Sequence, residues 1–279
     1  MTISERRSIR QFGSWPAWLF LAAFLGLPLG ALFVEALSEP ASFERVVGDG
    51  LFGTAIRNTL LLGLISGALS TLVGVAIAIE LSRQPESRRR VMMTLLGLPL
   101  AFSGLVIAFG FILAFGRAGL VTQLAAGLGA DAARVGSWLY SVWGLGFAYA
   151  YYLVPRVALS LYPVFSNLDE RPMQAARTLG ASRLRAFWDT VVPEVLPSVI
   201  TAATTVSALA MGTYGTALAL VGTQLNILPL LLFARVSDGA ADFPAAAAMS
   251  LILMGICMLV LAGGDLAARF HRRSSSRGA

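Results

Sequence analysis

Few side chains of this 279-residue chain are suited to covalent or metal chemistry. Cys257 is the only cysteine and lies inside an apolar run, which excludes an intramolecular disulfide and a thiol-based metal cluster. The only histidine, His271, lies in the polar tail, and a membrane-embedded enzyme would need a pair such as His-Glu-x-x-His. The chain has no lysine and therefore no phosphate-binding G-x-x-x-x-G-K-[ST] loop. We expect no catalytic residue, metal or cofactor on this chain.

The remaining candidate for a functional element is a polar, arginine-rich loop at residues 166–194, between two long apolar runs. Its first residues are good helix starters, so a short helix is expected at Met173–Leu179. Gly180 permits the turn of positive φ that ends such a helix. Ser182 can cap a second helix, and Pro193 marks the entry to the next apolar run. The pattern predicts two short helices at an angle on the membrane surface.

The elements that position this loop are long apolar segments. The chain is 57% hydrophobic and only 13% charged, about half the charged fraction of a soluble domain. The runs are continuous and lack the two-residue alternation of a membrane barrel, which favours an all-α membrane protein. We predict six transmembrane helices at about 15–37, 57–81, 91–115, 138–160, 195–221 and 244–268.

The arginines are distributed unevenly between the two sides of these spans. Clusters precede the first span, follow the second, fill the 166–194 loop and follow the last span, and this excess marks the cytoplasm. Both termini and the loop are therefore predicted to be cytoplasmic. A basic chain could also bind nucleic acid, but no aromatic–basic interleaving supports that alternative. The cytoplasmic arginines are Arg6, Arg7, Arg10, Arg83, Arg88, Arg89, Arg90, Arg171, Arg177, Arg183, Arg185, Arg269, Arg272, Arg273 and Arg277.

The loop also carries a sequence pattern. Gln174, Ala175, Ala176, Gly180 and Pro193 fall at the spacings of the cytoplasmic EAA loop, E-A-A-x3-G-x9-I-x-L-P. The chain therefore resembles the permease subunits of ATP-binding-cassette (ABC) importers. The order of the spans and the run Asn58-Thr59-Leu60 look similar as well. The departures from the pattern are Gln174 for Glu, Thr190 for Ile and Val192 for Leu.

The resemblance implies that this loop is a coupling helix, between the fourth and fifth spans, that docks on a dimer of cytoplasmic ATPase subunits. ATP and Mg²⁺ would be used by those partners. Without the resemblance, an amphipathic connector on lipid headgroups would explain the loop equally well. The expected docking residues are Gln174, Ala175, Ala176, Arg177, Leu179, Gly180, Arg183 and Pro193.

The resemblance also implies one permease domain, residues 1–279, in the bacterial inner membrane. It would pair with an identical or related permease and receive its solute from an extracytoplasmic binding protein. The layout most resembles the subgroup for polyamines, aminophosphonates, iron and thiamine, so a small polar solute of that class is expected. The alternative is a stand-alone secondary transporter or channel. No span carries the central carboxylate or histidine that a proton-coupled carrier needs.

The fifth predicted span is rich in hydroxyl groups. These either bond to carbonyls of their own helix or line a translocation pathway. Pro99 could break the third span. Arg156, inside the fourth, either extends its side chain to the cytoplasmic surface or contacts the loop or a partner subunit. The candidate pathway residues are Ser103, Thr204, Ser207, Met211 and Tyr214.

Overall fold

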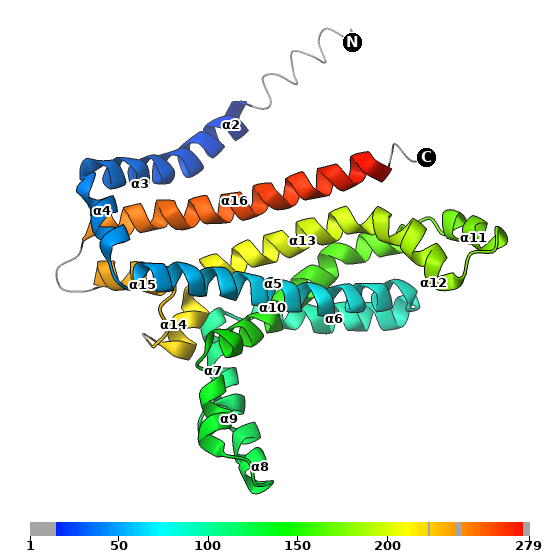
Figure 1. Ribbon diagram of the computed structural model, residues 1–279, viewed down its shortest axis with the longest axis horizontal. Helices are drawn as coiled ribbons and strands as arrows, with labels where there is room; N and C mark the ends of the chain where they lie inside the picture. The colour runs from blue at the N-terminus through cyan, green and yellow to red at the C-terminus, as the bar shows by residue number, and fades with distance from the viewer. Residues whose placement is uncertain (1–14, 223, 238–241, 276–279) are drawn as a thin grey trace. The chain divides into compact units, whose positions relative to one another are not determined.

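The computed structural model describes residues 15–222, 224–237 and 242–275, without the side chains of Ala17 and residues 272–275. Within these ranges every regular element is a helix (Figure 1), which confirms the predicted all-α class. Some arginines used to predict the orientation lie outside this description, namely Arg6, Arg7, Arg10 and Arg277, and the side chains of Arg272 and Arg273.

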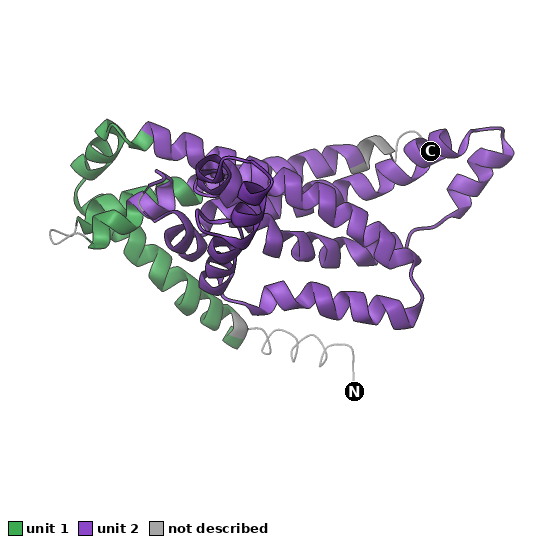
Figure 2. Ribbon diagram, turned by 90° about the horizontal axis from the view of Figure 1, so that it is seen from below, with its two compact units in different colours: residues 1–52, 232–254 green, residues 53–231, 255–279 purple. Residues whose placement is uncertain are grey.

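The chain forms two compact units (Figure 2): residues 1–52 with 232–254, and residues 53–231 with 255–279. The first unit begins with three helical elements in series, α2 (Trp15–Leu21), η1 (Ala22–Gly26) and α3 (Leu27–Ser38). Only 6% of the most apolar stretch of Trp18–Ser38 is buried within the protein. So much exposed apolar surface requires lipid or another subunit around it.

Ion pairs hold the polar end of the first unit together. Arg45 of α4 (Ala41–Gly48) donates to Glu39 at 2.6 Å and to Asp242 at 3.3 Å. A second pair joins Arg235, near the end of α15 (Leu228–Ser237), to Asp49. The hydrogen bond from Arg45 holds the pKa of Glu39 below its usual value. These pairs connect the segment around α4 to the start of α16 (Phe243–Ser275).

The second unit is built around α10, whose inward face is buried along most of its length. Glycines allow close packing of its neighbours, because a Cβ at Gly74 of α5 would overlap Val157 of α10, and a Cβ at Gly67 would overlap Ser207 of α13. Besides the start of α15 and the part of α16 from Gly255 on, the elements of this unit are α5 (Phe52–Arg83), α6 (Glu86–Ala101), α7 (Gly104–Phe115), α8 (Leu120–Gly127), α9 (Ala132–Trp138), α10 (Val142–Ser166), α11 (Arg171–Thr178), α12 (Arg183–Ala186), η2 (Phe187–Val191), α13 (Val192–Gly212) and α14 (Gly215–Val221).

Two polar side chains near the start of α5 fix the segment that follows α14. The Asn58 side-chain amide donates to the carbonyl of Asn226 at 2.9 Å. The Thr59 hydroxyl donates to its own helix at Ala55 and accepts from the backbone N–H of Leu228, also at 2.9 Å. Buried backbone groups need such partners, so the Asn-Thr pair near the start of α5 has a structural role.

Five helical segments of the described chain are long and apolar enough to cross a membrane: Trp18–Ser38, Phe52–Arg83, Gly104–Gly127, Arg183–Gly212 and Phe243–His271. The predicted span 138–160 corresponds to α10, which is 25 residues long but contains Arg156 and four tyrosines. These polar side chains lower the mean hydropathy of α10, and the helix is therefore not among the five apolar segments.

Two predicted spans are not continuous helices. The span predicted at 91–115 is broken between Ala101 and Gly104, just after Pro99, and its apolar segment instead runs from Gly104 to Gly127. The span predicted at 195–221 is broken at Thr213 and Tyr214. A run of apolar residues predicts that a segment enters the lipid. It does not predict where within that segment the backbone stops being helical.

Candidate functional site

The polar loop between α10 and α13 has the predicted local structure. The Asp169 side chain accepts from the N–H of Arg171 at 3.0 Å, in the first turn of α11. Gly180 then turns the chain with φ = +93°, and the Ser182 hydroxyl caps α12 by accepting from the N–H of Arg185. The glycine turn and the serine cap are thereby confirmed. Two short helices at an angle protrude at one end of their unit (Figure 1).

The loop exposes large apolar side chains that none of the residues described by the structure covers. Leu179 is 89% exposed, Leu184 69% and Trp188 59%. Ala186 and Val191 are buried and fix the loop to the unit. Exposed apolar groups on an ordered loop indicate a surface for another protein.

The predicted docking residues share this surface. Gln174, Ala175, Arg177, Leu179, Gly180 and Arg183 are exposed, whereas Ala176 and Pro193 are half-buried. The small side chains of the alanines leave the α11 backbone accessible to close approach. Arg185 pairs with Asp189 at 3.5 Å, so its charge is partly balanced within the loop.

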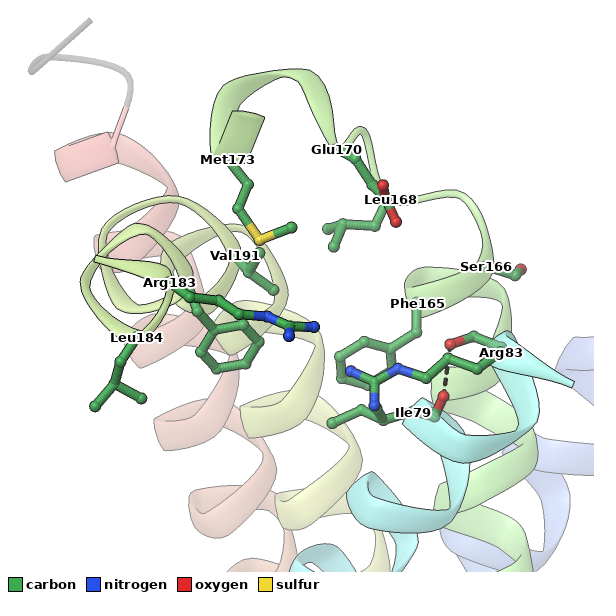
Figure 3. A pocket seen from close by; sticks show the side chains of 12 residues that line it. Ile79, Arg83, Phe165, Ser166, Leu168, Glu170, Met173, Arg183, Leu184 and Val191 are labelled. Atoms are coloured by element: carbon green, nitrogen blue, oxygen red, sulfur yellow. Dashed lines mark hydrogen bonds between the residues drawn. The ribbon is translucent and has the colours of Figure 1, made fainter. Parts of the chain in front are cut away.

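A pocket of about 680 Å³ lies beneath the loop (Figure 3). Arg83, at the end of α5, and Arg183 extend into it from opposite sides, while Phe165 and Met173 supply apolar walls. The loop is therefore spaced from the ends of α5 and α10 and is not packed flat against them.

The membrane interior of the same unit contains two interrupted helices. The break after α13 exposes the carbonyl of Thr213, and the Tyr149 hydroxyl donates to it at 2.9 Å. The Tyr152 hydroxyl lies 3.5 Å from the Thr213 Oγ1. Non-helical backbone at membrane depth is tolerated only where protein satisfies it or where it lines a polar cavity.

The second break lies beside the first. Ser103 ends the interruption between α6 and α7, and its hydroxyl accepts from the N–H of Val106 at 3.5 Å. A Cβ at Gly104 would overlap the Thr216 side chain at the start of α14, and α7 packs against α14. Broken helices meeting in this way are typical of the solute route in transport proteins.

The structure distributes the predicted pathway residues among different surroundings. Met211 is buried, and a Cβ at Gly63 of α5 would overlap its side chain. A Cβ at Gly264 of α16 would likewise overlap the Thr204 side chain. The remaining three are Ser207, which packs on Gly67; Ser103, which caps α7; and Tyr214, which immediately precedes α14 and packs against the core.

Several residues of this region were not selected from the sequence. Tyr149 and Tyr152 reach the break from α10, and Thr201 and Thr205 line a groove that includes Arg156. The i, i+4 spacing of the two threonines was a visible signal, whereas the tyrosines lie more than sixty residues from their partner. Residues 15–222, 224–237 and 242–275 contain no three His, Cys, Asp or Glu side chains close enough to hold a metal ion.

Broken helices in an all-helical membrane fold, together with an exposed polar loop, are typical of the membrane component of a transport system. Residues 70–273 match the family of binding-protein-dependent transport system inner membrane components. The chain belongs to this family and is a permease subunit of an ABC importer, a multi-pass protein of the inner membrane. The resemblance seen in the EAA-like loop is confirmed.

Curated relatives extend over most of the chain. The sulfate transport system permease protein CysW of Synechocystis sp. is 28% identical over 253 residues, 88% of each protein. CysT of Salmonella typhimurium is also 28% identical, and covers 98% of each. The molybdenum transport system permease protein ModB of Mycobacterium bovis is 27% identical over 89% of this chain. These relatives are transport subunits, not enzymes.

The fold is also similar to a solved structure. A chain of a bacterial alginate ABC transporter, in complex with an alginate-bound periplasmic protein, matches with a TM-score of 0.69 and 15% identity. The match covers 95% of both chains. At this identity the likeness concerns the fold alone.

Proposed function

We propose that this permease carries a small tetrahedral oxyanion of the sulfate and molybdate class. The proposal is supported by relatives named for sulfate and for molybdenum, whose soluble form in water is the molybdate dianion. The polyamine, aminophosphonate, iron and thiamine class expected from the layout is not supported by these relatives. All 21 basic residues are arginines, whose guanidinium groups suit planar recognition of oxyanions.

The loop at 166–194 is proposed as the docking element for a cytoplasmic ATPase dimer, which would bind and hydrolyse ATP with Mg²⁺. Support comes from the exposed Leu179, Leu184 and Trp188 on an ordered helical elbow. In this proposal the eight predicted docking residues, from Gln174 to Pro193, contact the ATPase. Gln174 offers a neutral amide where the pattern has a charged glutamate, so any contact there is weaker by about half.

We also propose six crossings, with α10 added to the five apolar segments, and both termini in the cytoplasm. The chain would then act as one permease domain, paired with a second identical or related permease. A stand-alone carrier remains the rival, and it predicts solute movement without nucleotide. The pathway residues Ser103, Thr204, Ser207, Met211 and Tyr214 stay a prediction.

The decisive experiment is reconstitution of the complete transporter in proteoliposomes, with its binding protein on one side and ATP on the other. Radiolabelled sulfate and molybdate should accumulate only with ATP, whereas putrescine and thiamine should not. Uptake of the cations but not the oxyanions would refute the solute class. Uptake by the purified chain alone would refute the ATPase-dependent role.

A matched test concerns the docking surface. Leu179→Ala and Leu184→Ala together should lower co-purification of the ATPase subunit. Replacement of the equally exposed Leu128, 91% exposed beyond α8, should leave it unchanged. Equal loss with both replacements would mean that the loop has no special part in docking.

A further inference from the structure

Arg156 lies within α10, the helix that we propose as a sixth membrane crossing, and none of the described carboxylates pairs with it. It lies ten residues before α10 ends at Ser166, which is about 15 Å along the helix. Its side chain is exposed, and it forms no hydrogen bond or ion pair with any residue that the structure describes. A charge at such a position usually faces a polar cavity and marks the route of a substrate or ion.

The cavity beside Arg156 is a groove of about 310 Å³ between α10 and α13. Four hydroxyl groups share it with the guanidinium, and none of the described residues that line it is acidic. Glu194 is the nearest acidic residue along α13, one turn before Ser198, and it has no ion pair with Arg156. One positive charge among hydroxyls suits an anion. The four hydroxyls belong to Ser160, Ser198, Thr201 and Thr205.

This groove leads toward the break in α13. Thr205 also lines a neighbouring pocket of about 360 Å³ that reaches Thr213. Thr201 and Thr205 lie one turn apart on one face of α13, and Thr213, the residue that ends this helix, lines the same pocket as Thr205. On α10, Tyr152 lies one turn from Arg156 and contacts the Thr213 side chain. The two helices thereby present a polar stripe from the interrupted backbone to the arginine.

The hydroxyls of the stripe are available for transient binding. Thr201 donates to the carbonyl of Pro197 at 2.9 Å, and Thr205 to that of Thr201 at 2.7 Å. Rotation of each side chain exchanges this neutral bond for one to an anion, which is roughly twice as strong. The Ser198 hydroxyl has no partner among the described residues. Such weak, exchangeable contacts suit an ion that must also leave.

We propose that Arg156, with Ser198, Thr201 and Thr205, forms an oxyanion-binding station in the inner half of the translocation pathway. The station rests on the proposed oxyanion solute and adds a specific place where that solute pauses before release. The phosphate of a lipid headgroup has the same chemistry, and the second experiment below separates the two sources.

The first experiment measures uptake by the complete transporter in proteoliposomes. Arg156→Gln should lower sulfate or molybdate uptake about tenfold, the effect of losing one charge-assisted hydrogen bond. Binding-protein-stimulated ATP hydrolysis should persist, and Arg156→Lys should retain most of the uptake. The control is Arg90→Gln, an exposed arginine on α6 that pairs with Glu86. Normal uptake by Arg156→Gln overturns the station. Failure of the unchanged transporter to move either oxyanion refutes the solute class instead.

The second experiment reports on the groove without transport. In a Cys257→Ser background, Thr201→Cys is treated with anionic and cationic methanethiosulfonate reagents. The anionic reagent should react faster, sulfate or molybdate should slow it, and Arg156→Gln should remove the preference. Equal rates before that substitution contradict an anion-selective groove. No reaction with either water-soluble reagent means that lipid covers the groove, which assigns Arg156 to a headgroup and overturns the proposal.

Discussion

The hydroxyl of Tyr149 donates a 2.9 Å hydrogen bond to the carbonyl oxygen of Thr213, a residue 64 positions later in the chain. Tyr149 is fully buried in α10, and Thr213 lies where α13 loses its helical backbone. The bond therefore satisfies a carbonyl that the helix no longer serves, and it ties the break to the central helix of the unit.

Removal of that hydroxyl should destabilise the break. Tyr149→Phe leaves the Thr213 carbonyl without its donor, at a cost of about 1–3 kcal/mol for a buried acceptor. We expect a lower midpoint of thermal unfolding for the purified transporter, together with slower uptake. Tyr151→Phe, on the same helix with an exposed ring, is the control. Identical midpoints for the two variants would show that the bond contributes nothing measurable.

The turn at Gly180 should be required for coupling. With φ = +93°, a β-branched residue there is strained by about 1–3 kcal/mol. Gly180→Val should therefore reduce ATP-driven uptake while the ATPase still hydrolyses ATP. Gly97→Val, on α6 where a Cβ would meet no atom within 4 Å, should transport normally. Full uptake by the Gly180 variant would exclude this turn from coupling.

The contact between α5 and α13 should be disturbed by a large side chain at Gly67. A Cβ there would overlap Ser207, and overpacking of this kind costs about 1–3 kcal/mol. We expect Gly67→Val to lower the thermal midpoint and the yield of assembled transporter. Gly53→Val, also on α5 but in open space, provides the comparison. Equal stability of the two variants would contradict this prediction, because it would mean that α5 and α13 can move apart with little loss of folding free energy.

Acid should weaken the ion pairs around Arg45. The pKa of Glu39 is lowered from 4.5 by the Arg45 hydrogen bond, so the paired carboxylate stabilises the folded chain above about pH 4.5. That contribution disappears as the pH falls through the lowered pKa. The thermal midpoints of the unchanged protein and Glu39→Gln should therefore differ at neutral pH and converge in acid. Glu44→Gln, next to Arg45 on α4 and without an ion pair among the described residues, should show no such convergence.

The loop was the most predictable part of the site, because its structure depends on local rules. A glycine after a short helix and a serine before the next one are sufficient to predict the turn at Gly180 and the cap at Ser182. The pattern of spacings also pointed to the correct family. Neither inference required knowledge of what the loop packs against.

The interior was less predictable, because its structure depends on contacts between distant segments. The hydropathy of 195–221 gave no reason to expect a break at Thr213, which is stabilised by hydroxyls from α10. Thr204 and Ser207 were selected for their hydroxyl groups, and the fold adds that each packs against a glycine of a neighbouring helix. Only the fold distinguishes a hydroxyl that faces a groove from one that fills a helix contact.

The uninterrupted helical segment from Arg183 to Gly212 has a mechanical consequence. Thirty residues extend about 45 Å, whereas the hydrocarbon layer is about 30 Å thick. The segment is therefore longer than the hydrocarbon layer is thick. We expect its Arg183 end to extend beyond the lipid, and its other end stops at the break beside Tyr149. Because the helical backbone is continuous, we expect a displacement of the outer end to be transmitted along the segment to the break at Thr213.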